Sequence, residues 1–266
     1  MKNIFLTITI AIFGSSLMAQ TTNMIIRTTD GNTHSYPITE IDSVYYQEGS
    51  VDGPGAGLSD YDGNNYTSII IGGKEWMAEN LKVTHYPNGD LIPLVTDNTA
   101  WGNLAANNTE DAYTYYNNNA NGEADTYGSL YTYAAAIGDN WARDNTANQG
   151  VCPDGWHLPT DVEWLELETY LGTNAGSKLA GYATLWSDGN LDQSIDFGTS
   201  GFSALPSGIR DNNGTFYFFG VNSFWWSASE NDSSSATNRY LDFNNTTVYS
   251  NNYDKSNGFS VRCLKN

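Results

Sequence analysis

Two cysteines are the first residues of this chain that could do chemistry. Cys152 and Cys263 are its only cysteines. A nucleophilic cysteine needs a nearby base, and His157 follows Cys152 closely in the chain. A zinc site needs about four ligands, and the three His and two Cys show no ligand spacing. The N-terminal pattern described below indicates export, and two cysteines in an exported chain most simply pair with each other. We therefore expect a structural disulfide and keep the nucleophile and the zinc site as alternatives.

Sequence patterns of known catalytic centres are missing. The chain has no G-x-S-x-G, no H-E-x-x-H and no Gly-rich phosphate loop. A pair of carboxylates for glycoside hydrolysis is defined by its placement in space, so a sequence cannot exclude one. We therefore expect no catalytic residues and a protein that is not an enzyme.

Aromatic and polar residues in the second half of the chain could bind a sugar. Two adjacent tryptophans lie in an apolar run typical of a strand, in which one side chain faces the core and the next faces solvent. A solvent-facing Trp beside amides and carboxylates can stack on a sugar ring; the alternative is that both belong to the core. We expect the site where the loop after residues 224–227 meets the polar loop around residues 113–121. Its candidate ligand-binding residues are Trp225, Trp226, Glu230, Asn231, Asp232, Tyr115 and Tyr116.

Calcium is a second possible ligand of the same loop. Glu230, Asn231 and Asp232 offer oxygens, and the turns at residues 188–190 and 211–214 could add more, although calcium takes six to eight oxygens at once. None of these segments has EF-hand spacing, and each is also an ordinary turn. We expect no metal and no other cofactor, with calcium kept as an alternative. A solvated turn between strands is the competing account of residues 230–235.

A capped helix and several strands must position these residues. Thr160 followed three residues later by Glu163 forms a capping box, which predicts a helix over residues 160–171 and explains both residues without a binding site. A second helix is expected within residues 128–138, and a hairpin turns on Gly72 and Gly73. Short strands are expected at residues 202–205, 216–219, 224–227, 239–243, 247–249 and 258–264. This order of elements favours an α+β fold over a βαβ repeat.

Three arginines are the remaining candidates for ligand binding. Arg210, Arg239 and Arg262 could form a carboxylate-binding patch. We favour internal ion pairs, with such partners as Glu163 or Asp242, because a guanidinium suits buried bidentate pairing.

Composition narrows the class of partner. The chain has 266 residues, with 11 Lys and Arg against 30 Asp and Glu, which gives a net charge of −19. Nucleic acid and anionic membrane surfaces are therefore not expected partners. Aromatic residues make up 14% and charged residues only 15%. This composition is typical of a turn-rich extracellular domain rather than of a helical cytosolic enzyme.

The N-terminus indicates export. Lys2 precedes the apolar run Ile4–Phe13, and small and polar residues follow up to Ala19. This pattern predicts a signal peptide over residues 1–19. The run is too short to span a bilayer, and no other stretch could do so. We expect a secreted protein of the periplasm or the cell surface of a Gram-negative bacterium, without a membrane span.

Three segments follow the signal peptide. A short β-hairpin unit is expected over residues 20–46, turning at Asp30-Gly31 and adding a short third strand at residues 41–46. Residues 47–63 have the composition of a flexible linker. The main domain is expected over residues 64–266.

The main domain resembles a bacterial family, the Fibrobacter succinogenes major paralogous domain. The matching segments cover nearly the whole domain in order, and the hairpin unit lies outside them, resembling the short modules that precede surface domains in secreted Bacteroidetes-type proteins. They are IGGKEWMAENLKVTHYPNGD (71–90), YTYAAAIG (131–138), GVCPDGWHLPTDVEWLELETYLG (150–172), GFSALPSGIRDNNGTF (201–216), FWWSASE (224–230) and NGFSVRCLK (257–265).

A more distant similarity connects the G-W-H-L-P-T helix start and the terminal G-F-S-V-R with formylglycine-generating, sulfatase-modifying enzymes. The resemblance implies a C-type-lectin-like α+β domain with an antiparallel sheet, few helices and long loops. It also implies that Cys152 and Cys263 lie close together. The activity does not carry over, because those enzymes use active-site cysteines and the two here would staple the scaffold. We expect a non-catalytic, cell-surface-associated binding module with a glycan ligand. The alternative is a structural or protein-interaction domain of the envelope.

Overall fold

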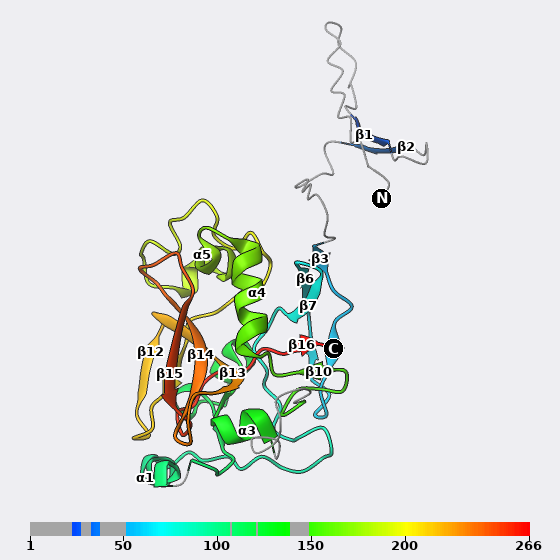
Figure 1. The fold of residues 1–266 in the computed structure, drawn as a ribbon. Coiled ribbons are helices and arrows are strands. Elements are labelled where there is room, and N and C mark those ends of the chain that lie inside the picture. The colour runs from blue at the N-terminus through cyan, green and yellow to red at the C-terminus, as the bar shows by residue number, and fades with distance from the viewer. Residues whose placement is uncertain (1–22, 28–32, 38–51, 107, 121, 139–148) are drawn as a thin grey trace, which may run out of the picture. The chain divides into compact units, whose positions relative to one another are not determined.

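The structure is a computed structural model that describes residues 23–27, 33–37, 52–106, 108–120, 122–138 and 149–266 (Figure 1). The chain divides into two compact units, residues 1–48 and residues 49–266, which are described separately. In the first unit, β1 (Asn23–Arg27) pairs antiparallel with β2 (Thr33–Pro37). The expected hairpin is therefore present. Its turn, the third strand and the signal peptide lie outside the described residues.

One five-stranded sheet of the second unit brings the ends of the domain together. Its order is β10 (Trp156–His157), β16 (Leu264–Lys265), β7 (Lys74–Met77), β6 (Ser68–Ile71) and β3 (Gly53–Pro54), and every neighbouring pair is antiparallel. Gly72 and Gly73 connect β6 and β7 with φ of 61° and 79°. Positive φ at two successive residues is a hairpin geometry that glycine adopts without strain, so the predicted Gly-Gly hairpin is confirmed.

The expected linker is partly folded. Residues 52–63 carry β3 and β4 (Leu58–Ser59), and β4 pairs with β5 (Asn65–Tyr66). Asp60 holds this segment, since its carboxylate accepts hydrogen bonds from the Asn64 backbone N–H and the Tyr66 hydroxyl at 2.9 and 2.6 Å. Gly- and Ser-rich composition predicted a linker here, and long-range strand pairing overrides that local preference.

A second five-stranded sheet carries most of the C-terminal half. Its order is β12 (Phe216–Phe219), β11 (Ser207–Arg210), β13 (Asn222–Glu230), β14 (Ser235–Asp242) and β15 (Tyr249–Asp254). The β11–β13 pair is parallel and the other three pairs are antiparallel. The strands expected at residues 202–205 and 258–264 are mostly isolated bridges, such as Ala180 with Ala204 and Trp225 with Ser260.

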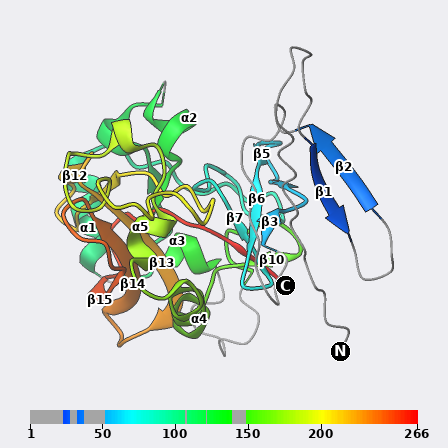
Figure 2. The ribbon, with the colours of Figure 1, turned by 90° about the horizontal axis from the view of Figure 1, so that it is seen from above.

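Helices are few and short in the described part of this unit. The long one is α4 (Asp161–Leu171), whose predicted capping box between Thr160 and Glu163 is confirmed. It packs on β13 and β14 (Figures 1 and 2). The helix expected within residues 128–138 is shorter, because β9 (Leu130–Tyr131) pairs with β8 (Tyr113–Thr114) and α3 (Tyr133–Ile137) begins after it. The others are α1 (Asn98–Asn103), α2 (Glu123–Tyr127), α5 (Ala175–Leu179) and the 3₁₀ turns at Leu104–Ala106, Tyr116–Asn118 and Ala183–Leu185.

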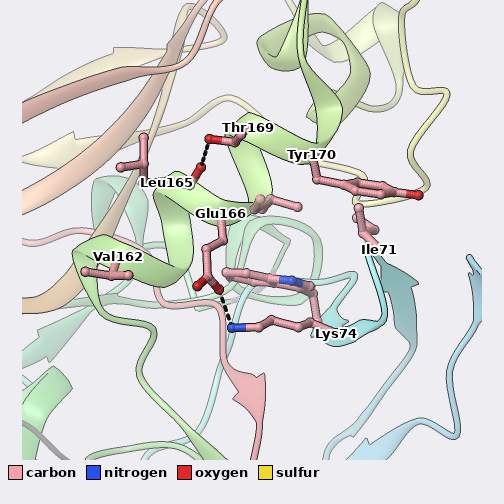
Figure 3. A pocket seen from close by; sticks show the side chains of 10 residues that line it. Ile71, Lys74, Val162, Leu165, Glu166, Thr169 and Tyr170 are labelled. Carbon is pink, nitrogen blue, oxygen red and sulfur yellow. Dashed lines mark hydrogen bonds and ion pairs between the residues drawn. The ribbon is translucent and has the colours of Figure 1, made fainter. Parts of the chain in front are cut away.

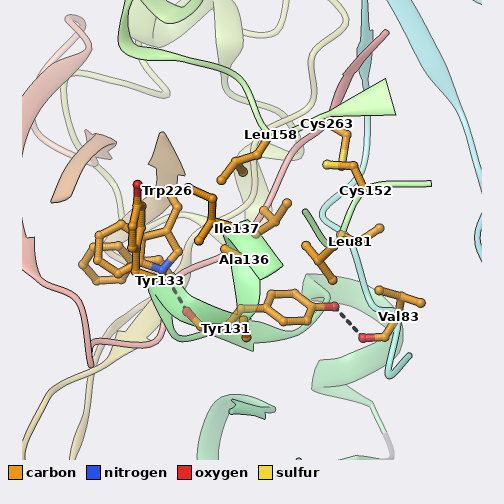
Figure 4. Close-up of a cluster of buried hydrophobic side chains, with 14 of the residues drawn as sticks. Leu81, Val83, Tyr131, Tyr133, Ala136, Ile137, Cys152, Leu158, Trp226 and Cys263 are labelled. Carbon is orange, nitrogen blue, oxygen red and sulfur yellow. Dashed lines mark hydrogen bonds between the residues drawn. A yellow bond between two sulfur atoms is a disulfide. The ribbon is translucent and has the colours of Figure 1, made fainter. Parts of the chain in front are cut away.

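Strand β13 separates two hydrophobic clusters. Trp226 packs with Tyr133 and Phe259 in one, which also contains the two cysteines (Figure 4). Trp225 lies on the other face and packs on Trp164 of α4. The unit is thus a mixed α+β fold with mostly antiparallel sheets and few helices, in which a central strand is covered on both faces.

Candidate functional site

Both tryptophans of the expected sugar site are buried. Trp225 and Trp226 have no exposed surface, and their indole N–H groups donate to Asn80 Oδ1 and to the Tyr131 carbonyl at 3.0 and 2.8 Å. The prediction that one of them faces solvent is wrong. Alternation along a strand places successive side chains on opposite faces, but both faces of β13 are covered. The alternative that both belong to the core is confirmed.

The two tyrosines of that site pack on other aromatic rings. Tyr116 is 9% exposed and stacks on Phe219, with ring centroids 4.5 Å apart. Tyr115 is half-buried and meets Tyr113 edge to face at 5.6 Å. Neither leaves a free aromatic platform beside the candidate carboxylates.

The polar residues of the site form a turn between β13 and β14. Glu230 pairs with the buried Lys255 at 2.8 Å. Asp232 Oδ1 accepts hydrogen bonds from the backbone N–H groups of Ser234 and Ser235, each at 2.8 Å. These bonds hold the pKa of the Asp232 carboxyl below its usual range. Both carboxylates thus have partners within the protein, Glu230 in Lys255 and Asp232 in the turn itself, which agrees with the account of this segment as a turn between strands.

The two halves of the expected site lie at opposite ends of β13. Tyr116 packs against Phe219 and Gly208, and Gly208 pairs with Ser223 at the start of the strand. Glu230 is its last residue. At about 3.3 Å per residue the separation is roughly 25 Å, so the structure does not assemble this site. Over residues 52–106, 108–120, 122–138 and 149–266, no group of three or more His, Cys, Asp or Glu side chains is placed to hold a metal ion.

The cysteines form the expected disulfide. Cys152 and Cys263 have Cα atoms 5.9 Å apart and are fully buried (Figure 4). The nucleophile and zinc alternatives are therefore wrong.

His157 is part of a charged network at the start of α4. Its Nε2 lies 3.1 Å from both carboxylate oxygens of Glu163, and its Nδ1 lies 2.6 Å from Asn266 Oδ1. Burial by itself would lower the pKa of His157, but the hydrogen bonds to Glu163 and Asn266 and the charge of Glu163 raise it. Burial would raise the pKa of Glu163, but the bonds from His157 and Thr160 lower it to about 2. The network joins the C-terminus to the helix.

We expect this pair to make stability depend on pH. The raised pKa of His157 contributes stability that is complete below about 6.5, the unfolded value, and is lost as pH rises through the folded value. The lowered pKa of Glu163 contributes stability that is present above 4.5 and is lost as pH falls through about 2. Urea unfolding should show a loss of about 1 kcal/mol between pH 6 and pH 9 in the wild type but not in His157→Gln. Equal pH dependence in both proteins would contradict this.

The three arginines differ in their partners. Arg239 pairs with Asp161 and Glu168, each at 2.5 Å, so it forms the expected internal ion pairs but with other carboxylates. Arg210 and Arg262 are fully buried and donate mainly to backbone carbonyls. For these two the expected ion pairs with Glu163 or Asp242 are wrong. None of the three guanidinium groups forms a patch that could receive an external carboxylate.

A hollow of about 520 Å³ lies between α4 and the β6–β7 hairpin (Figure 3). Ile71 and Trp76 of the hairpin and Leu167 of the helix form its buried part. At its rim, Lys74 Nζ pairs with Glu166 Oε2 at 2.5 Å. The Tyr170 ring lies over Gly72, where a Cβ atom would come within 3.0 Å of it. The hairpin turn thus needs glycine for its close contact with the helix as well as for its φ.

Three large side chains on the exposed face of α4 also line this hollow. Val162 and Leu165 are 63% and 53% exposed, and Tyr170 is 38% exposed. The helix reaches the core with Trp164 and Leu167 instead. We call the hollow together with Val162, Leu165 and Tyr170 the α4 groove. The sequence could have indicated this groove, because the helix has more apolar residues than one buried face can hold.

Comparison with known proteins supports the family. A model of the Fibrobacter succinogenes major domain matches residues 69–265. No curated protein and no solved structure matches the chain. No helix in the part of the chain that the structure describes combines the length and apolar character needed to cross a bilayer. Since the match covers most of the chain, the protein belongs to the Fibrobacter succinogenes major domain family.

Proposed function

We propose that this chain is a secreted, non-catalytic binding module of the bacterial cell envelope that holds an apolar segment of a protein partner in the α4 groove. The observation that carries the proposal is the exposure of Val162, Leu165 and Tyr170 beside a hollow of about 520 Å³. Large apolar side chains around a concavity are typical of interaction sites. The module works without a metal or other cofactor in this proposal.

The chemistry of the α4 groove favours a peptide segment over a sugar. Its floor is built from Ile71, Trp76 and Leu167, which are hydrocarbon side chains apart from the Trp76 indole N–H. The charges of Lys74 and Glu166 satisfy each other at the rim. A sugar needs several hydrogen-bond partners around an aromatic face, whereas an apolar side chain of a partner needs only a dry pocket with a polar rim.

The finer fold assignment and the compartment are part of the same proposal. A C-type-lectin-like fold is supported by mostly antiparallel sheets, few helices and the adjacency of β16 and β7 from opposite ends of the domain. Export is supported by the signal sequence and by the buried disulfide, which persists in oxidising compartments. Intact mass of protein recovered from periplasm and medium should show loss of residues 1–19. A retained leader would contradict export.

Photo-crosslinking in the native envelope tests the α4 groove. A photoreactive phenylalanine analogue at position 165 should give one discrete protein adduct, because Leu165 is exposed beside the hollow. The same analogue at position 195 is the control, since Ile195 is 97% exposed and lies outside the groove. Adding Val162→Glu should reduce the adduct at position 165 at least fivefold. Equal labelling from both positions, or an adduct that Val162→Glu leaves unchanged, would reject the groove as a protein-binding site.

A further inference from the structure

A second hollow, of about 450 Å³, shares no lining residue with the α4 groove. Segments far apart in the chain form it: the end of the β6–β7 hairpin, the α2 region and the irregular stretch before β11. It combines aromatic, hydroxyl and carboxylate groups. The residues that the argument uses are Thr67, Glu79, Thr126, Tyr182, Ser203 and Leu205. We call it the Tyr182 pocket.

Tyr182 has an aromatic ring that is exposed and packs on no other ring among the described residues. Its side chain is 66% exposed. Among the described residues it has no ring contact, and its hydroxyl has no hydrogen-bond partner. Other exposed aromatics differ, since Tyr217 and Phe218 pack on each other with centroids 5.9 Å apart. Tyr182 therefore presents an aromatic face at the rim of a concavity without stabilising the core.

The backbone holds Tyr182 in a strained conformation. Its φ is 55° and its ψ is 66°. Of the seven described non-glycine residues with positive φ, four are Asn, which adopts this region readily, and Tyr182 and Ser203 both line the pocket. Hydrogen bonds of the preceding residue help to impose this conformation. Gly181 donates its N–H to the Ala204 carbonyl at 2.9 Å and accepts from the Trp186 indole at 3.0 Å.

Strain of this kind costs stability and persists where the surrounding structure enforces it. Bulky residues at positive φ are outliers that cluster at ligand sites. Asn or Gly at position 182 would adopt the same backbone more easily. An exposed ring that packs on no other aromatic ring, placed where another residue would be more stable, is accounted for by an interaction with a ligand.

The wall of the pocket supplies polar partners. Glu79 Oε1 accepts hydrogen bonds from the N–H and the hydroxyl of Thr67, both at 2.8 Å, which fixes the carboxylate and leaves Oε2 for a ligand. Hydroxyl groups of Thr126 and Ser203 lie around the same hollow. Arg262 anchors the floor, because its Nη2 donates to the Ser203 carbonyl at 2.9 Å. The Glu79 carboxylate is thus held before a ligand arrives, and so is the Ser203 hydroxyl, which donates to the Gly201 carbonyl at 3.3 Å and can accept from a ligand.

From this geometry we infer that the Tyr182 pocket binds a neutral sugar residue of a glycan, whose C–H face stacks on Tyr182 while its hydroxyls bond to Glu79, Thr126 and Ser203. A volume of about 450 Å³ holds one or two pyranose rings. A fixed carboxylate accepts sugar hydroxyls, and it repels the carboxylate of an acidic sugar. The net charge of −19 acts in the same direction. This site does not depend on the α4 groove.

The test is binding of neutral oligosaccharides to the full mature chain. Hexamers of glucose, mannose, galactose and xylose are titrated by calorimetry and by saturation-transfer NMR, beside oligogalacturonate as an acidic comparison. At least one neutral hexamer should bind. Tyr182→Asn should weaken it at least about tenfold, because the stacking face is lost. Tyr182→Phe should stay within about threefold, since the ring remains.

Two controls separate a ligand role from a structural one. Tyr217→Ala removes an aromatic side chain that is 41% exposed but lies outside the pocket, and it should leave affinity within twofold. The melting temperature of Tyr182→Asn should equal or exceed the wild-type value, because Asn relieves the strained φ.

Glu79→Gln keeps an acceptor for Thr67 and should weaken binding about threefold to tenfold.

Three results would overturn the inference. One is that no neutral hexamer binds at millimolar concentration. Another is that Tyr182→Asn binds as tightly as the wild type. The third is that oligogalacturonate binds better than every neutral hexamer. Crosslinking from position 165 reports on the α4 groove alone, so failure of either proposal is seen without reference to the other.

Discussion

Replacing Arg262 by methionine should lower the free energy of unfolding by at least about 4 kcal/mol. The guanidinium is fully buried and joins three segments of the domain. Its Nε donates to Asn80 Oδ1 at 2.7 Å, and its Nη groups donate to the carbonyls of Met77, Phe202 and Ser203. Burial lowers the pKa of Arg262 to about 9, with the charge of Glu79 acting in the opposite direction, so the side chain stays charged at pH 7.

The size of this effect follows from the acceptors that methionine would leave behind. Each buried acceptor without a donor costs about 1–3 kcal/mol, and the carbonyls of Met77, Phe202 and Ser203 lose their partner at once, whereas Asn80 Oδ1 keeps the Trp225 indole. Methionine fills much of the volume, so the loss reports on hydrogen bonding more than on a cavity. Urea unfolding at pH 7 measures it.

Lys265→Met is the matched control. Lys265 also carries a positive charge near the C-terminus, but its side chain is 43% exposed and it pairs with Glu75 at 2.6 Å at the surface. An exposed ion pair of this kind contributes about 0–1 kcal/mol. Similar losses of unfolding free energy from both substitutions would show that the hydrogen bonds from Arg262 to the surrounding carbonyls do not hold the three segments together.

Removing the disulfide should give the second large effect. The pair Cys152→Ala and Cys263→Ala should lower the free energy of unfolding by about 3 kcal/mol and the melting temperature by about 6–12 °C. The bond closes a loop with a sequence separation of 111, so the unfolded chain gains considerable freedom when it is cut. Part of the effect comes from lost packing, because both residues are fully buried in the cluster that contains Trp226.

Chemical reduction provides the comparison for the disulfide prediction. Wild-type protein unfolded in excess reductant should approach the stability of the double variant, whereas the double variant should not respond to reductant. A loss below about 1 kcal/mol in the variant would mean that the loop is already constrained in the unfolded state.

Features that depend on neighbours in the chain could be predicted from the sequence. The Gly72-Gly73 hairpin and the Thr160–Glu163 capping box are confirmed because each is decided within a few residues, by permitted backbone angles or by a hydrogen bond across one helical turn. The disulfide could be predicted because the chain has only two cysteines, which leave one pairing.

The candidate site depended on contacts that local patterns do not contain. Alternation predicted that Trp225 and Trp226 face opposite sides of β13, and they do, but it cannot tell how many sides are covered. Likewise, the residues that expose large side chains in the structure, Val162, Leu165 and Tyr182, differ from the aromatics that the sequence singled out.

The sequence by itself thus determined the α+β class, the family, the capped helix, the tight hairpin and the pairing of the cysteines. Only the tertiary structure decided that β13 is central, that Arg210 and Arg262 bond to carbonyls rather than to carboxylates, and that Tyr182 lies at the rim of a pocket. The physical reason is the distance along the chain over which each interaction acts. Turns and caps are local equilibria of a few residues, whereas burial and long-range hydrogen bonds depend on segments such as residues 77–80, 202–203 and 262 meeting in space.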